Sequence, residues 1–305
     1  MSVINTDNNK PNINMQKLSK KPKYKSIPTY LTETKCNEFI LPHLSRGKRG
    51  PECSIPLYKV FNYVLKFMHT GVQWEQLPID LNHAGKPEIH YTRIFRIYQR
   101  WVNDSSFAKI FDSSVMKLFE KRLLDLSILH GDGSSTCAKK GGDLIGYNGH
   151  KHFKGEKVIA IVDRNVNVLT PYIQASGNRN ECPLFIPALE SLKNITKKIG
   201  ASIAGSIMSL DGVYDSKKNR KAIFNSKMTP NIPENKRNRK QNKRGKKRLF
   251  DKDIFSERFQ TIERLFAWED KFKRLLLRFE RKSKNHFGLK LIAFAMINLR
   301  HFCNP

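Results

Sequence analysis

Apolar residues recur at helical spacing in the first part of the chain. A helix is predicted from Pro56 to Thr70, because its apolar residues stand three or four positions apart and Gly71 follows as a stop. These residues are Leu57, Val60, Phe61, Val64 and Met68. A second amphipathic helix is predicted over 87–102, and the pattern stays helical throughout residues 35–125.

From about residue 126 the pattern changes to short apolar runs rich in β-branched residues, which predict strands. Four such runs cover 126–132, 157–163, 168–176 and 206–212, and a prolyl run at 228–233 suits an edge strand. Helices are predicted over 183–198, 216–224, 251–282 and 286–303. The order strand, hairpin, helix, strand, helix, strand is typical of an α/β domain with a mixed sheet.

These patterns divide the chain into three parts. Residues 1–34 are rich in Asn, Lys, Ser and Pro and are predicted to be a disordered basic arm. Residues 35–125 form a small all-helical region, and residues 126–305 form the α/β domain with a basic insertion at 234–249. The insertion has no apolar periodicity, so we expect a loop there.

The charge of the chain points to a polyanionic partner. Lys and Arg number 56 against 27 Asp and Glu, which gives a formal charge of +29, and nucleic acid is the commonest partner for such a chain. A membrane is disfavoured because the longest apolar stretch, 291–299, is far shorter than a bilayer span. The polar N-terminus resembles no secretory signal, and five scattered cysteines suit reduced thiols, so we expect a cytoplasmic protein.

Basic side chains gather at two candidate DNA-binding places. Arg93, Arg96 and Arg100 share one side of the helix 87–102; an ordinary solvated face is the alternative, but the chain's charge favours a helix-turn-helix-like DNA reader. The basic insertion is the second place. Its position inside the chain favours a phosphate-binding loop over a localisation signal, and its candidate contacts are Lys243, Arg244, Lys246 and Lys247.

Two aspartates follow apolar runs in the same way. Asp132 and Asp211 each stand directly before a glycine at a predicted strand end. An Asp-Gly turn is the ordinary explanation of one such pair. If the two strands are neighbours, however, the carboxylates converge and can hold magnesium, whose preferred ligands are hard oxygens. Two such ions about 4 Å apart can stabilise both the attacking and the leaving oxygen when a phosphodiester is cleaved.

A third carboxylate is expected from the helix 251–282. Glu263 stands next to Ile262 at the edge of the predicted buried face, and its own face continues as a basic stripe of Lys271, Arg274, Arg278 and Arg281. An exposed helix glutamate is the alternative for Glu263 alone. Weaker candidates for metal ligands are His150 with His152, Asp143 and Asp163. Asp163 closes a predicted hairpin, where Asp is a normal turn residue.

Three segments, 132–163, 209–224 and 257–280, together with "GVQWEQLPI" at 71–79, resemble bacterial insertion-sequence transposases of the "insertion sequence five" group. The resemblance implies a ribonuclease-H-like fold and a DDE active site in which Asp132, Asp211 and Glu263 bind Mg²⁺, which Mn²⁺ can replace. The chain departs from the family on one helix: the family's tyrosine and arginine are Ser256 and Phe259 here, and Asp270 stands where a lysine is usual.

The expected activity is therefore transposition of a mobile element: cleavage of double-stranded DNA at terminal inverted repeats and transfer of the 3′ ends to target DNA. We expect a homo-oligomer on DNA, associated with the bacterial nucleoid and with no membrane partner. Two alternatives stay open: a DNA-binding protein without catalysis, such as a decayed or repressor-like copy, and a stand-alone nuclease of the same fold.

Overall fold

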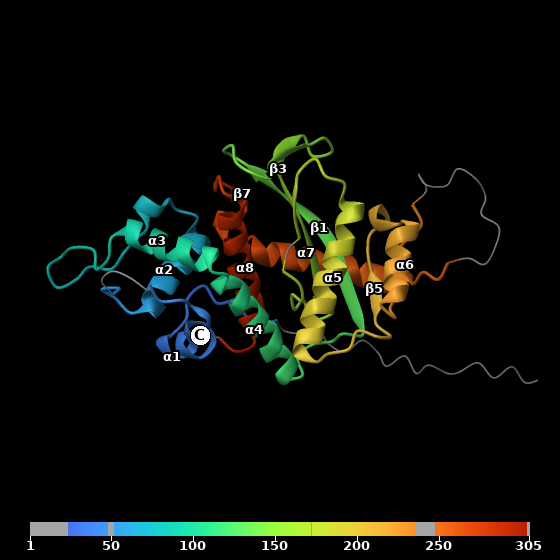
Figure 1. The fold of residues 1–305 in the computed structure, drawn as a ribbon, viewed down its shortest axis with the longest axis horizontal. Coiled ribbons are helices and arrows are strands. Elements are labelled where there is room, and N and C mark those ends of the chain that lie inside the picture. Colours follow the sequence, from blue (N-terminus) through green and yellow to red (C-terminus); the bar gives the residue numbers. More distant parts are fainter. Residues whose placement is uncertain (1–23, 48–51, 172, 236–247, 304–305) are drawn as a thin grey trace, which may run out of the picture.

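The computed structural model describes residues 24–47, 52–171, 173–235 and 248–303. Helices from the first part of the chain gather on one side, and the sheet with its flanking helices lies on the other (Figure 1). The predicted architecture, a mixed sheet with flanking helices preceded by an all-helical region, is confirmed.

The helical region consists of α1 (Glu33–Phe39), α2 (Leu57–Thr70), α3 (Tyr91–Asn103) and α4 (Ser106–Glu120). Helix α2 ends where the sequence predicted, because Gly71 takes the left-handed conformation (φ 74°) and its N–H donates to the carbonyl of Phe67. Helix α3 packs its apolar face through Ile94, Tyr98 and Trp101, all buried.

The sheet is built around β1. Its strands are β1 (Ile128–Ala138), β2 (Gly146–Asn148), β3 (Phe153–Asp163), β4 (Ile173–Ser176), β5 (Ile207–Ser209), β6 (Thr229–Asn231) and β7 (Leu277–Arg278). The order is β2-β3-β1-β5-β6, with β4 on β3 and β7 on β1. Strand β1 is antiparallel to β3 but parallel to β5 and β7, so the sheet is mixed as predicted.

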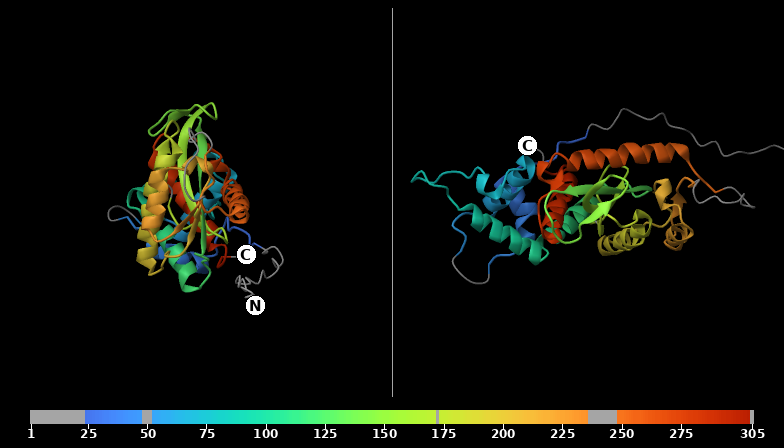
Figure 2. Two further views of the ribbon diagram at one scale, coloured as in Figure 1. Left: turned by 90° about the vertical axis from the view of Figure 1, so that its right-hand side faces the viewer. Right: turned by 90° about the horizontal axis from the view of Figure 1, so that it is seen from above.

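Helices cover both faces of this sheet. Helices α5 (Glu181–Ile199) and α6 (Lys217–Asn225) lie on one face, and α7 (Lys252–Glu269) lies on the other, as the edge-on view in Figure 2 shows. Because successive residues of a strand point to opposite faces, β1 presents its side chains alternately to α5 and to α7.

Helix α8 (Ser283–Leu299) joins the two parts of the molecule. It is buried along almost its whole length and packs against α4. Tyr98 of α3 donates a hydrogen bond to the carbonyl of Asn285, and Asn298 bonds both Ser114 of α4 and Val168 beyond β3. One continuous apolar core therefore runs from the helical region into the sheet. The domain boundary near residue 125 remains a prediction.

Three sequence predictions require correction. Strand β1 continues past its predicted end at residue 132 to Ala138, so Asp132 lies in mid-strand. The helix predicted over 251–282 ends at Glu269, and the chain then forms a short 3-10 turn, Lys273–Leu275, and strand β7. Tertiary pairing of β7 with β1 replaces the helix that the local sequence favours.

The third correction concerns the predicted arm. Its residues 24–34 are not a free tail, because Ile27 and Leu31 are buried in the core and the ring of Tyr24 packs edge-on against Trp268. Residues 1–23 lie outside the described part of the chain, as does most of the basic insertion, 236–247. Within the described residues, we find no helix of the length and apolarity needed to cross a membrane.

Candidate active site

The register of β1 and β5 brings the two aspartates level with each other. The strands run parallel, with His130 opposite Ser209, so two residues farther along Asp132 stands level with Asp211. Asp211 follows the end of β5 and precedes the short 3-10 helix Gly212–Tyr214. The condition set by the sequence, that these strands be neighbours, is met.

Strand β5 ends at Ser209, which leaves part of β1 without a partner on that side. Strand β7 pairs with the same edge only at Cys137 and Ala138, so no strand of the described part of the chain covers this edge at residues 131–136. We call this gap the β1 notch. Asp132 lies within it: its Oδ1 accepts the N–H of Gly133 at 2.8 Å, and Asp211 accepts the N–H of Gly212 at 2.6 Å.

An arginine of α7 reaches Asp132. The Nη1 of Arg258, whose side chain is 6% exposed, lies 2.8 Å from Asp132 Oδ2. Burial raises the pKa of Asp132 above its usual value, Arg258 partly offsets this, and the charge of Asp211 raises it further. The notch thus holds two carboxylates close enough to affect each other and one buried guanidinium. No sequence signal identified Arg258, because a single arginine in a helix is usually a surface residue.

A second group of polar side chains approaches the notch from the α5 face. A Cβ placed on Gly133 would lie 2.9 Å from Glu181 Oε2 and 3.0 Å from Tyr214 Oη. Tyr214 is fully buried, and its hydroxyl has no hydrogen-bond partner among the described residues. Burial raises the pKa of Tyr214 well above its usual value, and the charges of Asp132, Glu181 and Asp211 raise it further. Neither Glu181 nor Tyr214 was predicted as a site residue.

Helix α7 does not bring Glu263 to these groups. Its buried residues are Arg258, Thr261, Ile262, Leu265 and Glu269. Five residues separate Glu263 from Arg258, which turns it about 140° away at 100° per residue. Glu263 is exposed and has no hydrogen bond or ion pair to any described residue. Ile262 is buried as predicted, whereas Phe259, three residues before it on α7, is 61% exposed.

A second glutamate of α7, Glu257, lies near β1 and has partners that hold the fold together. Glu257 accepts from Arg164 Nε at 2.6 Å and lies 3.3 Å from Nε2 of His130, which is fully buried. Burial alone would raise the pKa of Glu257, but the hydrogen bonds from His130 and Arg164 lower it to about 2. This carboxylate therefore fixes α7 on the sheet.

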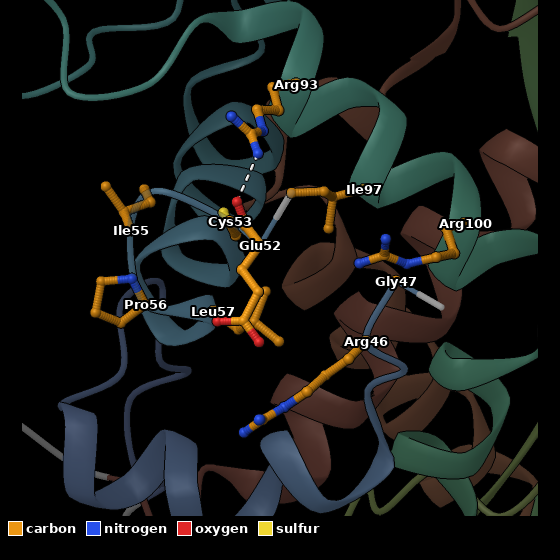
Figure 3. Close-up of a pocket in the computed structure, with 10 residues that line it drawn as sticks. All are labelled: Arg46, Gly47, Glu52, Cys53, Ile55, Pro56, Leu57, Arg93, Ile97 and Arg100. Carbon is orange, nitrogen blue, oxygen red and sulfur yellow. Dashed lines mark hydrogen bonds between the residues drawn. The ribbon is translucent and has the colours of Figure 1, made fainter. Parts of the chain in front are cut away.

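Two arginines of α3, Arg93 and Arg100, border a pocket of about 270 Å³ in the helical region (Figure 3). Arg93 donates to the carbonyl of Glu52 and Arg100 to that of Ser45, while Arg46 reaches into the pocket from the other side. Arg96 alone of the three predicted DNA contacts on α3 is classed as exposed. Arg93 and Arg100 thus form hydrogen bonds that stabilise the helical region, in addition to any contact with DNA.

The predicted basic stripe after Glu263 is not a helix face. Arg278 is fully buried, 2.8 Å from both Glu156 and Asp143, and Arg274 pairs with Glu280 at 2.9 Å. Lys271 is exposed. Lys243, Arg244, Lys246 and Lys247 lie outside the described residues.

The chemistry of the notch fits a hard divalent cation. Among the described residues no three His, Cys, Asp or Glu side chains form a ready-made metal cluster. Magnesium, however, is usually held by one or two carboxylates, with waters and substrate phosphates completing its shell. Asp132 and Asp211 provide such a pair, and the unpartnered Tyr214 hydroxyl shows that the notch has unused hydrogen-bonding capacity.

The weaker metal candidates have other roles or other surroundings. Asp143 pairs with Arg278, and Asp163 accepts the backbone N–H of Asn165 and Asn167, as expected of a hairpin turn. The ring of His152 lies 3.3 Å from the hydroxyl of Tyr147 on an exposed turn.

One comparison with known proteins identifies a family for most of the chain. A family described as "Transposase DDE domain" matches residues 107–299. No curated protein matches. Among solved structures the chain is similar to the "Mos1 transposase paired-end complex with left transposon end", at 10% sequence identity and a TM-score of 0.26 over 61% of each chain. The chain thus spans less than two thirds of that structure's chain, and the likeness is too low to bear on function.

Proposed function

The chain belongs to the transposase DDE domain family, and from this premise we propose that it cleaves DNA at the inverted repeats of an insertion sequence and transfers the 3′ ends to target DNA. The motifs at 132–163, 209–224 and 257–280 favour the "insertion sequence five" group within that family. The observation that carries the proposal is the level placement of Asp132 and Asp211 at the open edge of β1.

Asp132 and Asp211 are proposed to hold Mg²⁺, which Mn²⁺ can replace. When bound, such ions activate a water or a 3′-hydroxyl as nucleophile and stabilise the leaving 3′ oxygen. The two carboxylates would position the ion. The N–H groups of Gly133 and Gly212 each hold one carboxylate oxygen, of Asp132 and Asp211 respectively, in place. Arg258 donates to the other oxygen of Asp132, which offsets part of the rise in the pKa of this carboxyl that burial causes.

Glu263 is the third ligand that the resemblance implies, and it stays a prediction. Its support is the motif "TIERLFAW", in which it stands at the family's glutamate position. Because it lies about 140° around α7 from Arg258, a role at the ion requires α7 to turn or shift when DNA binds.

DNA contacts are proposed for the exposed basic residues. Arg96 on α3 is exposed, whereas Arg274 and Arg278 are held in ion pairs. The basic sequence of the insertion supports the same proposal for Lys243, Arg244, Lys246 and Lys247. Strand transfer joins two transposon ends to one target, so we expect at least a dimer on DNA.

A strand-transfer assay separates the proposal from its alternatives. The full-length protein is incubated with Mg²⁺, a labelled duplex carrying the inverted repeats that flank its own gene, and a supercoiled target plasmid. A transposase produces a nick at the repeat's 3′ end and then a labelled plasmid. Nicked duplex without labelled plasmid would identify a nuclease, and a bound but intact duplex would identify a non-catalytic DNA-binding protein.

A further inference from the structure

Glu181 and Tyr214 form a part of the β1 notch to which the proposed function assigns no role. Glu181 is the first residue of α5, on the face of the sheet opposite α7. Its Oε1 lies 3.3 Å from the ammonium of Lys157, and its side chain is 23% exposed. Its Oε2 points instead at Gly133, within 2.9 Å of the position that a Cβ there would occupy.

Gly133 makes this approach possible. A Cβ at this position would lie 2.9 Å from Glu181 Oε2, closer than real Cβ atoms come, and a tight 3.0 Å from Tyr214 Oη, so a neighbouring side chain would have to shift. The glycine next to Asp132 thus opens β1 to the α5 face. Because β5 and β7 leave the same stretch of edge uncovered, Glu181 and Tyr214 lie beside the notch that contains Asp132.

The hydroxyl of Tyr214 is the second and independent observation. Its ring packs against Phe185 at a centroid distance of 6.2 Å, which fixes where Oη points. That hydroxyl is buried without a partner among the described residues, and leaving such a group unpaired costs about 1–3 kcal/mol. Three carboxylates, Asp132, Asp211 and Glu181, lie near enough to act on it electrostatically. A buried hydroxyl without a partner, close to Gly133 where Glu181 also points, indicates a site that is completed by a ligand.

We infer that Glu181 is a further acidic residue of the active site, which accepts a hydrogen bond from water bound to the divalent cation that Asp132 and Asp211 hold, with Tyr214 as a positioning residue. When the ion is bound, Tyr214 would donate its hydroxyl hydrogen to one of the three carboxylates and thereby set the orientation of that carboxylate toward the ion. Lys157 offsets part of the negative charge that gathers when no ion is bound. This inference rests on the proposed metal-dependent cleavage at Asp132 and Asp211.

The test measures Mn²⁺ binding to the full-length protein without DNA by isothermal titration calorimetry. Glu181→Gln keeps the shape of the side chain and removes its charge, and we expect it to weaken Mn²⁺ binding about tenfold or more, the scale on which groups around a metal site act. The matched control is Glu190→Gln on the same helix, an exposed glutamate paired with Lys193, which should bind Mn²⁺ as the wild type does.

Tyr214→Phe removes only the hydroxyl and should also weaken Mn²⁺ binding while keeping the packing on Phe185. It serves as the second variant if Glu181→Gln does not fold, which melting curves without metal reveal. Wild-type Mn²⁺ affinity in both Glu181→Gln and Tyr214→Phe, alongside lost affinity in Asp211→Asn, would overturn the inference and leave the proposed function intact. Wild-type affinity in Asp211→Asn as well would overturn both.

Discussion

Replacing Arg278 by Met should destabilise the fold without changing how the protein binds DNA. The guanidinium is fully buried and lies 2.8 Å from Glu156, which is also fully buried. Removing one partner of such a pair leaves a buried charge unpaired and costs about 3–5 kcal/mol. At 2–4 °C per kcal/mol for a domain of this size, the melting temperature should fall by ~10 °C. Thermal melts and urea titrations measure this loss.

Two further variants make the reasoning refutable. Arg281→Met alters an exposed arginine three residues away and should leave the melting temperature unchanged. Adding Glu156→Gln to Arg278→Met removes the stranded carboxylate, so the double variant should be more stable than the single one. A double variant that is no more stable, or an Arg278→Met protein as stable as the wild type, would refute the ion-pair account. DNA binding is measured as the slope of log affinity against log salt concentration. If Arg278→Met makes this slope shallower by about 0.9, Arg278 contacts a phosphate instead.

Three more predictions concern the site and its supports. Gly133→Ala should lower the free energy of unfolding by about 1–3 kcal/mol in urea titrations, because its Cβ meets Glu181 and Tyr214, whereas Gly141→Ala, with open space around it, should not. Glu257→Gln should cost ~3 kcal/mol at neutral pH, since the pKa of Glu257 is lowered to about 2. Thermal melts from pH 7 to pH 2 should show that the difference in stability between Glu257→Gln and the wild type shrinks below about pH 4.5. A difference that stays constant over this range would contradict the proposed hydrogen bonds of the Glu257 carboxylate. Arg96→Ala should reduce the salt slope of DNA affinity by about 0.9 with no change in melting temperature, and an unchanged slope would place Arg96 off the DNA.

Local patterns predicted much of the fold. Gly71 ended α2 as expected, and the alternation of short strands and helices after residue 126 predicted the mixed sheet. The prediction that the helix continues beyond Glu269 was wrong for a physical reason. Lys, Arg and Leu favour helix locally, but Arg278 gains buried partners on β3 and β7 gains a place beside β1. Such gains come from residues far away in the sequence, so no local window reveals them.

The site was predictable only where strand geometry decides it. Two Asp-Gly pairs after apolar runs indicated Asp132 and Asp211, and the parallel register brings them level. Arg258, Glu181 and Tyr214 were missed because their roles depend on the gap that β5 and β7 leave along β1. The gap depends on how many residues of β5 and β7 pair with β1. The sequence of β1 alone does not reveal this.

The central claim, that Asp132 and Asp211 form a strand-cleaving centre, is tested most directly by cleavage of a duplex that carries the element's own inverted repeat in Mg²⁺. The account predicts that Asp211→Asn binds this duplex as tightly as the wild type, or more tightly since a negative charge near the phosphates is lost, and yet releases no 3′ end. Asp253→Asn, an exposed aspartate in the first turn of α7, should cleave normally. Cleavage by Asp211→Asn at the wild-type rate would contradict the account.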